Sequence, residues 1–444
     1  MLQPESEERS ARRVKQLGRE VGFDLVRIAS ASDMHVERAR YLAWIEAGRH
    51  AGMSWITGER AQRATSPTTV FPEARAVISV GLGYWGGHRP RSSGMDGKIA
   101  RYAWGLDYHT VMGNQLERFS AALHQEFGEH HRWYVDTGPT MDKAFAAQSG
   151  LGFYGKNTNV LSEELGSFVL LGEILTSLEL TPDEPLGKDC GSCRLCVRAC
   201  PTGALGPEYT IDSRRCISYL TIEHRGPIPR ELRGAMDRWV FGCDICQDVC
   251  PPTMEKYLHS AGERRAWARE VRAQLSTGWA QGAELGDLAT DPSAVNPLFV
   301  QNVRPHVDLI WLLSLTHDEY LDAFRGTAIR RAKVWMLRRN AAVALGNVGD
   351  QHCLPALLAA LRTDEHPVVR GHAAWALGQI GARHCEPDLD HRLREALRRE
   401  DDVTVRDEIA LARRSLVAAC ASSEKEGGQQ RRDATASRSS SEPN

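Results

Sequence analysis

The sequence predicts an α+β protein in three parts: an N-terminal α/β domain, a cysteine-rich insert and a C-terminal region of α-helical repeats. Three observations lead to this fold class. Helix and strand patterns alternate along residues 1–180, eight cysteines gather between residues 190 and 250, and a helical motif repeats after residue 338. We expect domains at 1–185, 186–255 and 256–421, followed by a tail at 422–444 that is rich in Ser, Gln and charge and is expected to be disordered.

Along the N-terminal domain, segments with the apolar spacing of a helix alternate with segments that have the pattern of a strand. Helical spacing recurs every three to four residues, whereas the strand candidates are alternating or continuously apolar. This alternation favours an α/β or α+β domain. The expected elements are a helix and a short strand within 7–30, a strand at 74–85, a helix at 109–127, a strand at 132–138, a short helix at 139–150 and a strand at 166–180.

Composition and charge place few limits on function. The chain has 444 residues, of which 42% are hydrophobic and 25% charged, with a formal net charge of −2, as is ordinary for a folded domain protein. Its first residues contain no apolar segment typical of a signal peptide, and the most apolar run, Phe168–Leu175, is too short to span a bilayer. We therefore expect a cytoplasmic protein without membrane association, in which thiols stay reduced and clustered cysteines bind metal.

Eight cysteines form two groups that each end in Cys-Pro. The first group has the spacing C-x2-C-x2-C-x3-C-P, and the second has C-x2-C-x3-C-P with one more cysteine upstream. The first spacing is typical of ferredoxins, in which three thiolates hold one four-iron cluster and the fourth crosses to a second cluster. We therefore predict two [4Fe-4S] clusters in a ferredoxin-like insert. By the crossing rule, one cluster takes Cys190, Cys193, Cys196 and Cys250, and the other takes Cys200, Cys216, Cys243 and Cys246.

Two structural zinc sites are the alternative interpretation of the same cysteines. Zinc sites usually show two separated C-x2-C pairs, which is not the spacing of this chain. Iron–sulfur clusters transfer single electrons, so the insert predicts electron transfer without identifying what is reduced. The remaining cysteines, Cys353, Cys385 and Cys420, lie in apolar helical contexts and are expected to be core thiols.

The stretch GLGFYG, from Gly150 to Gly155, matches the G-x-G-x-x-G pattern of dinucleotide-binding loops, with Glu173 at a suitable distance. That function requires a helix directly after the glycines. The residues that follow, KNTNVLSEELG, contain several helix breakers. We instead expect Gly-rich backbone that passes close to a large flat ligand.

Asp136 ends a predicted strand, just before a short predicted helix. An Asp at such a position commonly caps the helix, but Thr137 offers an alternative cap and leaves the carboxyl group free. In an enclosed cleft, burial would raise the pKa of Asp136 and allow it to donate a proton. The spacing alone leaves both roles open.

The C-terminal region contains a motif that recurs at a spacing of 32 residues. Arg338 recurs as Arg370 and Gly346 recurs as Gly378. Small residues on an apolar helical face, followed by a Gly-closed turn, are typical of HEAT-like helical hairpins. The repeats predict a short helical array.

Six Lys or Arg residues and no acid lie between Phe324 and Leu345. Most basic runs are solvated surfaces, but this one would also suit contact with a phosphate backbone. We expect Arg331 and Arg338 to share one helix face, although the recurrence at Arg370 allows a structural role for Arg338. The other members are Arg325, Arg330, Lys333 and Arg339.

Taken together, the motifs resemble those of the epoxyqueuosine reductase family. They are VDTGP, SGLGFYGKNTN, GSFVLLGEILT, DCGSCRLCVRACPTGAL, RRCISYLTIEHRG, FGCDICQDVCP and FRGTAIRRAKVWMLRRNAAVALGN, in this order within residues 10–385. The resemblance implies an oxidoreductase that converts epoxyqueuosine at the tRNA wobble position to queuosine. It also implies a cytoplasmic monomer that binds the anticodon stem-loop of tRNA and takes electrons from an unidentified donor.

The resemblance further implies the cofactors and site residues. A cobalamin would bind in the N-terminal domain and receive electrons through the two [4Fe-4S] clusters, and Asp136 would be the catalytic proton donor to the departing oxygen. Two electrons and two protons would remove the epoxide oxygen as water. The sequence TMDK after Pro139 replaces the family's more usual hydrophobic-Glu-Arg ending. The positions that match the family's cobalamin contacts are Arg63, Ala100, Val160, Leu171, Ser213 and Asp244.

Two other interpretations account for part of the sequence. A reductive dehalogenase also joins a corrinoid to two four-iron clusters, but such enzymes usually carry a twin-arginine leader and lack C-terminal repeats. A ferredoxin-type electron carrier with a protein-interaction scaffold would explain the cysteines and the repeats. It would leave the N-terminal domain without a function, and the sequence therefore favours the reductase.

Overall fold

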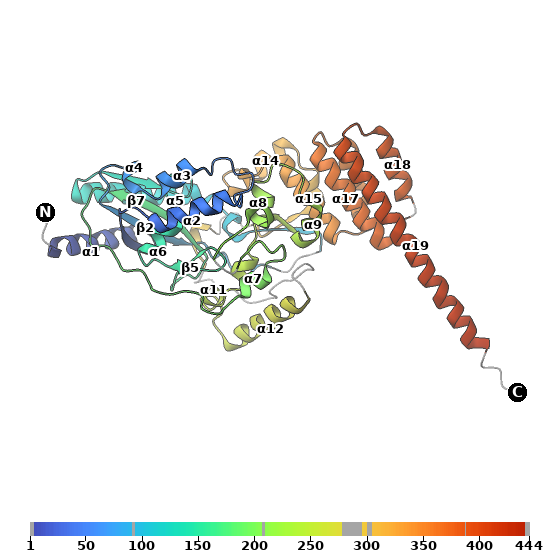
Figure 1. Cartoon of the computed structure of the whole chain (residues 1–444), viewed down its shortest axis with the longest axis horizontal. Helices are drawn as coiled ribbons and strands as arrows, with labels where there is room; N and C mark the ends of the chain where they lie inside the picture. The colour runs from blue at the N-terminus through green and yellow to red at the C-terminus, as the bar shows by residue number, and fades with distance from the viewer. Residues whose placement is uncertain are drawn as a thin grey trace.

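The computed structural model describes residues 4–90, 94–206, 209–277, 295–299, 304–386 and 388–439. The molecule is elongated, with the N-terminal domain at one end, the helical array at the other and the cysteine-rich segment between them (Figure 1). Within the described ranges, no helix is both long and apolar enough to cross a membrane. The described backbone continues helix α19 (Val403–Ser439) into the tail expected to be disordered at 422–444, and the side chains of that tail lie outside the described residues, so its disorder stays a prediction.

A four-stranded sheet forms the centre of the N-terminal domain, and all of its strand pairs are antiparallel. The mixture of helices and strands confirms the predicted fold class. The antiparallel pairing decides between the two arrangements that the alternation had left open, in favour of α+β. The strand order is β1 (Leu25–Ser30), β2 (Ala76–Gly83), β7 (Val169–Thr176) and β4 (His131–Tyr134).

Helices cover both faces of this sheet. On one face α1 (Pro4–Val21) packs with α5 (Tyr108–Phe127), and on the other lies the short helix α6 (Asp142–Gln148). Ile78 of β2 belongs to the apolar core that contains α1 and α5, whereas its neighbour Val77 packs in a separate cluster with α6. Because β2 is buried on both faces, its sequence AVISVGLG is apolar apart from Ser79.

A second, three-stranded sheet joins segments that lie far apart in the sequence. Its central strand β3 (Asp96–Ile99) pairs in parallel with β8 (Trp239–Phe241) and antiparallel with β9 (His306–Asp308). Each strand comes from a different one of the three expected domains. The segments therefore share a sheet, and the boundaries expected at residues 185 and 255 stay predictions.

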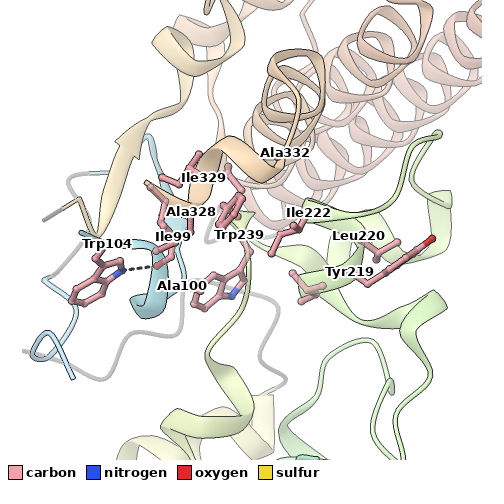
Figure 2. Close-up of a cluster of buried hydrophobic side chains, with 14 of the residues drawn as sticks. Ile99, Ala100, Trp104, Tyr219, Leu220, Ile222, Trp239, Ala328, Ile329 and Ala332 are labelled. Carbon is pink, nitrogen blue, oxygen red and sulfur yellow. Dashed lines mark hydrogen bonds between the residues drawn. The ribbon is translucent and has the colours of Figure 1, made fainter. Parts of the chain in front are cut away.

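The same three segments share an apolar core around this sheet, as Figure 2 shows. The indole of Trp104 donates a hydrogen bond of 2.8 Å to the carbonyl oxygen of Ile99, so the chain after β3 is held against the core. The labelled side chains are Ile99, Ala100 and Trp104 from the N-terminal domain, Tyr219, Leu220, Ile222 and Trp239 from the cysteine-rich segment, and Ala328, Ile329 and Ala332 from the helical region.

The predicted helical array is confirmed, and its repeated glycines mark close helix crossings. A Cβ on Gly346 would lie 2.3 Å from Cζ3 of Trp375, and a Cβ on Gly378 would lie 2.7 Å from Cα of Ala412. Only a glycine allows the next of these helices to approach so closely. Glycine therefore recurs at the same position of each repeat, 32 residues apart. In chain order the helices are α15 (Val334–Val348), α16 (Leu354–Thr363), α17 (Pro367–His384), α18 (Leu389–Arg399) and α19 (Val403–Ser439), of which α15, α17 and α19 pack side by side.

The basic run does not form one helical face, so that prediction is wrong. Arg331 ends a short 3-10 turn, η6 (Ala328–Arg331), whereas Arg338 lies on α15. Ala332 and Lys333 have extended backbone conformations and separate the two elements. The helical spacing between Arg331 and Arg338 therefore has no structural counterpart.

Two arginines of the basic run stabilise the fold. Arg338 pairs with Asp364 at 3.2 Å, and Arg370, one repeat later, pairs with Glu400 at 2.8 Å. This confirms the alternative that Arg338 is a repeated structural residue. Arg339 is completely buried, and its guanidinium group donates to backbone carbonyl oxygens of the cysteine-rich segment at Leu220, His224 and Gly226.

Candidate active site and cluster sites

The four cysteines predicted for the first cluster line one cavity of about 120 Å³. Cys190 and Cys193 lie in the loop before α7 (Leu195–Ala199), and Cys196 lies in the first turn of that helix. Cys250 directly precedes α11 (Pro251–Met254), whose first residue is the proline of the Cys-Pro pair. Their common cavity supports the crossed ligand set.

The four cysteines predicted for the second cluster come from the ends of three short helices. Cys200 follows α7, Cys216 precedes α8 (Ile217–Ile222), and Cys243 and Cys246 lie on either side of the start of α10 (Ile245–Asp248). Burial raises the pKa of the Cys243 and Cys246 thiols well above the usual value, and the nearby Cys216 raises both further. Thiols that influence one another in this way are close together, as a shared cluster requires.

The other cysteines are not part of these sites. Cys353 is completely buried in the main core, Cys420 packs against the same core, and Cys385 is half-buried at the end of α17. Within the described part of the chain, no group of three His, Cys, Asp or Glu side chains is placed to hold a single metal ion.

The glycine-rich stretch Gly150–Gly155 leads into a hairpin of β5 (Phe153–Tyr154) and β6 (Val160–Leu161). The strand β5 lies within the glycine-rich stretch and a turn follows Gly155, where a dinucleotide-binding loop would have a helix, which excludes that alternative. Gly150 has a φ of +69°. A Cβ on Gly152 would lie 2.4 Å from Cγ1 of Val160. The glycines are therefore needed for the turn and for the close packing of the hairpin.

The loop of this hairpin, residues 155–159, contacts both cluster sites. The backbone N–H of Lys156 donates to Sγ of Cys190 at 3.4 Å, and its Nζ donates to two carbonyl oxygens of the cysteine loop at 2.5 and 3.1 Å. Asn157 Nδ2 donates to the carbonyl oxygen of Cys246 at 3.3 Å. Sequence reasoning missed these residues because the sequence KNTN matches no ligand pattern.

Asp136 follows β4 with a φ of +23°, in the left-handed region. It does not cap α6, whose N-cap residue is Met141. Its carboxylate, 47% exposed, accepts hydrogen bonds from the hydroxyl group of Tyr108 and from His109, with 3.0 Å between Oδ1 and Nε2. The other ring nitrogen of His109 lies 2.8 Å from a carboxylate oxygen of Asp107. Asp136 is thus free of a capping role and surrounded by groups that exchange protons.

The pKa of Asp136 is lower than usual, which contradicts the raised value expected from the sequence. Burial raises this pKa, but hydrogen bonds from His109 and Tyr108 outweigh burial because they stabilise the ionised carboxylate. His109 shows the opposite shift: its hydrogen bonds to Asp107 and Asp136 raise its pKa to about 9. At neutral pH the proton therefore lies on His109 and the negative charge on Asp136.

Two of the predicted cobalamin contacts lie beside the second cluster site. Ser213 is buried, and its carbonyl oxygen accepts the N–H of Cys216. Asp244 immediately follows Cys243, and its Oδ2 accepts hydrogen bonds from the backbone and the side chain of Arg101. Oδ1 of Asp244 is buried and has no hydrogen-bond partner among the described residues. A buried acceptor without a partner is costly, so this atom marks a position for a donor on a bound molecule.

The remaining predicted contacts are distributed over the N-terminal domain. Ala100 is buried and directly precedes Arg101, so it lies next to Asp244. Val160 and Leu171 pack in one small apolar cluster. Arg63 is exposed on α3 (Gly58–Ala64). The structure thus places Ala100 next to Asp244 and Val160 with Leu171, and the roles of all these residues as cofactor contacts stay predictions.

Lys143 on α6 lies close to the second cluster site. Its side chain is exposed, yet desolvation lowers its pKa, and the nearest charges that act on it include those of Cys246 and Cys216. Lys143 therefore lies within electrostatic reach of the second cluster site.

Arg331 and Trp55 form an exposed pair near Asp136. The guanidinium carbon of Arg331 lies 5.2 Å from the centre of the Trp55 ring, and its Nε donates to Glu223 at 2.7 Å. The Trp55 ring is 44% exposed and the Arg331 side chain 54% exposed. The positive charge of Arg331 also acts on Asp136. An aromatic ring and a cation beside a candidate catalytic carboxylate offer a surface for a nucleobase and its phosphate.

Comparison with known proteins identifies the family. The chain is 37% identical to an epoxyqueuosine reductase of Synechocystis sp. (strain ATCC 27184 / PCC 6803 / Kazusa) over 318 residues, which cover 71% of this chain and 98% of that protein. The chain belongs to the epoxyqueuosine reductase family. It is also 35% identical to the epoxyqueuosine reductase of Escherichia coli (strain K12), over 83% of this chain and 89% of that protein.

Three family models match successive parts of the chain. The model described as "Epoxyqueuosine reductase QueG, DUF1730" matches residues 64–137, a 4Fe-4S double cluster binding domain matches 189–253, and HEAT repeats match 324–413. The protein is therefore an oxidoreductase with an iron–sulfur domain and HEAT-like repeats. The dehalogenase and electron-carrier alternatives are not favoured.

Solved epoxyqueuosine reductases have the same fold. A selenomethionine-labelled crystal structure covers 92% of this chain and 99% of its own, with a TM-score of 0.76 and 28% identity. A structure with an epoxyqueuosine-modified stem loop of tRNA-Tyr gives the same values. A structure of the Bacillus subtilis enzyme, with its catalytic aspartate loop swung out of the active site, has a TM-score of 0.74.

The crossed ligand sets predict which cluster each cysteine controls. Cys250→Ser should remove the first cluster and Cys216→Ser the second, so each variant should retain about four iron atoms per chain. Iron analysis and electron paramagnetic resonance of anaerobically purified protein measure this, with Cys385→Ser as the control that keeps both clusters. A Cys250→Ser protein with two intact clusters would contradict the assignment.

Proposed function

We propose that the protein reduces epoxyqueuosine in tRNA to queuosine. Two electrons and two protons break both carbon–oxygen bonds of the epoxide, release the oxygen as water and leave an alkene. Family membership supports this activity. The observation that carries the proposal for this chain is the set Asp107–His109–Asp136, in which a protonated ring nitrogen faces a half-exposed carboxylate at 3.0 Å.

We propose cobalamin as a further cofactor, next to the second cluster. The residues there fit it: Oδ1 of Asp244 is a buried acceptor without a described partner, and the amide side chains of a corrin carry N–H donors. When bound, cobalamin supplies a strongly nucleophilic, low-potential cobalt centre for the attack on the epoxide. Arg63, Val160 and Leu171 would complete the contacts.

The exposure of the thiols supports a direction for electron transfer. Cys193 is exposed at the first site, and the proposed cofactor contacts Ser213 and Asp244 lie at the second. Electrons would enter at the first cluster, from a one-electron donor that docks over Cys193, and leave from the second. The enzyme would act as a monomer in the cytoplasm, where thiols stay reduced.

Asp136 would pass a proton to the departing oxygen. In the free protein this carboxylate is ionised, because His109 and Tyr108 stabilise its charge against the effect of burial. The proton on His109 faces Oδ1 of Asp136 at 3.0 Å, so it can move to Asp136 as the substrate oxygen gains negative charge. Asp107 would hold the ring of His109 in position from its other side.

The surface around Arg331 would receive the tRNA. A relative has been solved with an epoxyqueuosine-modified stem loop, and a loop of this kind presents unpaired bases and phosphates. Trp55 would stack on a base, and Arg331 would bind a phosphate after exchanging its bond to Glu223. Arg338 would not contribute, because it is mostly buried and paired with Asp364.

The role of Asp136 predicts that Asp136→Asn abolishes turnover. The amide cannot carry the transferred proton, and general acid catalysis contributes about 100-fold or more to rates. Single-turnover conversion of modified stem-loop RNA measures the loss, while iron and cobalt contents should equal those of the unaltered protein. Turnover within a factor of about 3 of the wild type would remove Asp136 from the proton path.

The raised pKa of His109 predicts a pH dependence. Its protonated form persists up to about pH 9, so turnover should be retained at neutral pH and fall as the pH rises through about 9. Asp107→Asn removes the strongest cause of the shift and should move this fall by about one pH unit toward the usual pKa of His. Profiles that coincide for the two proteins would show that His109 does not supply the proton.

Arg331 and Arg338 give a matched pair of variants for tRNA binding. Arg331→Gln should weaken binding of the anticodon stem-loop and reduce the slope of log K against log salt by about one, because one phosphate contact is lost. Arg338→Gln should leave the slope unchanged and instead lower thermal stability. Equal slopes for the wild type and Arg331→Gln would place the RNA elsewhere.

A further inference from the structure

A buried lysine without a carboxylate partner lies at the first cluster site. Lys156 is only 7% exposed. In the described part of the chain its Nζ bonds to the carbonyl oxygens of Gly191 and Cys193, and it forms no ion pair with an acid. Its own backbone N–H donates to the sulfur of Cys190.

A buried ammonium group is costly unless a negative charge balances it. Asp189 also lines this cavity but, among the described residues, forms no ion pair with Lys156. The larger negative charge there is that of the cluster, since four thiolates more than balance the charge of the iron–sulfur core. A bound cluster would therefore balance the charge of Nζ and accept the N–H to sulfur hydrogen bond of Lys156. Lys156 lines the same 120 Å³ cavity as the four cysteines.

A second lysine, Lys143, is held by the same loop on the side of the other cluster. Nζ of Lys143 donates to the carbonyl oxygen of Thr158 at 2.9 Å and to Oδ1 of Asn159 at 3.3 Å. Its charge acts on the thiols of Cys246 and Cys216. In the same loop, Asn157 is bonded to the backbone of Cys246 at 3.3 Å. The loop 155–159 thus provides one lysine and anchors the other.

We propose that Lys156 raises the reduction potential of the first cluster and Lys143 that of the second, with both lysines positioned by the loop 155–159. Reduction adds one electron to a cluster without breaking a bond, so a fixed positive charge and an N–H to sulfur bond stabilise the reduced form. Lys156 has the larger effect, because solvent screens the exposed Lys143 more strongly.

The two lysines thereby adjust the two steps of electron transfer separately. Each acts through its cluster and takes no part in the proposed proton transfer. The proposal rests on the iron–sulfur domain of the family and is independent of the proposed substrate, so an inactive enzyme would not affect its test.

The test is a redox titration of the reconstituted full-length protein, followed by electron paramagnetic resonance. Lys156→Gln should lower the reduced-to-oxidised ratio of one cluster about tenfold at a fixed potential, which is about 59 mV for a one-electron couple. Lys143→Gln should shift the other cluster in the same direction by a smaller factor. The matched variants Lys156→Arg and Lys143→Arg keep the charge and should titrate like the wild type.

Unchanged titrations in both Gln variants, or a shift of the same cluster in both, would overturn the proposal. Arg variants that shift as far as the Gln variants would also overturn it, because charge would then not be the cause. If Lys156→Gln protein fails to retain iron, the exposed Lys143 decides: a lowered potential of one cluster in Lys143→Gln supports the proposal, and an unshifted titration refutes it.

Discussion

Cysteines from both ends of the cysteine-rich segment line one cavity, and the rest of the structure depends on this constraint. Residues 190–200 and 243–250 must meet, so the chain between them has to fold back on itself. The three-stranded sheet fixes this return, because β8 ends just before Cys243 and pairs with β3 of the N-terminal domain. The cluster sites therefore have a fixed position relative to the domain that contains Asp136.

Buried charge is balanced differently in different parts of the molecule. Near the second cluster, Arg101 forms ion pairs with Asp244 and Asp248, and all three groups are buried. Between the cysteine-rich segment and the helical array, Arg339 is satisfied by neutral carbonyl oxygens. Lys156 is also bonded to carbonyl oxygens but lies against thiols that become negative when they bind iron. Protein groups alone balance the first set of charges, whereas Lys156 needs the cofactor.

Features that depend on local sequence could be predicted well. The helix at 109–127 and the strands β2 and β7 follow from apolar periodicity, and the double-cluster domain follows from cysteine spacing, while the assignment of each cysteine to a cluster stays a prediction. The sheet formed by β3, β8 and β9 could not be predicted, because its strands are three or four residues long and pair across more than 130 positions. Such pairing depends on tertiary packing, which the local pattern of apolar residues does not reveal.

The candidate site shows the same limit. Asp136 could be identified from its motif, but its pKa depends on Tyr108 and His109, which lie at the start of a different element. The shared face of Arg331 and Arg338 was wrong because two extended residues interrupt the helical spacing. Lys156 was missed because its function depends on contacts with a loop more than 30 positions away.

The exposure of Cys193 has a consequence for the living cell. Cys196 and Cys250, at the same cluster site, are buried, so dissolved oxygen and peroxide reach that cofactor from the side of Cys193. Damage to iron–sulfur centres begins where oxidants have access. Oxidative stress would therefore stop the supply of electrons at its entry point first, while the interior centre and the RNA-binding surface stayed intact.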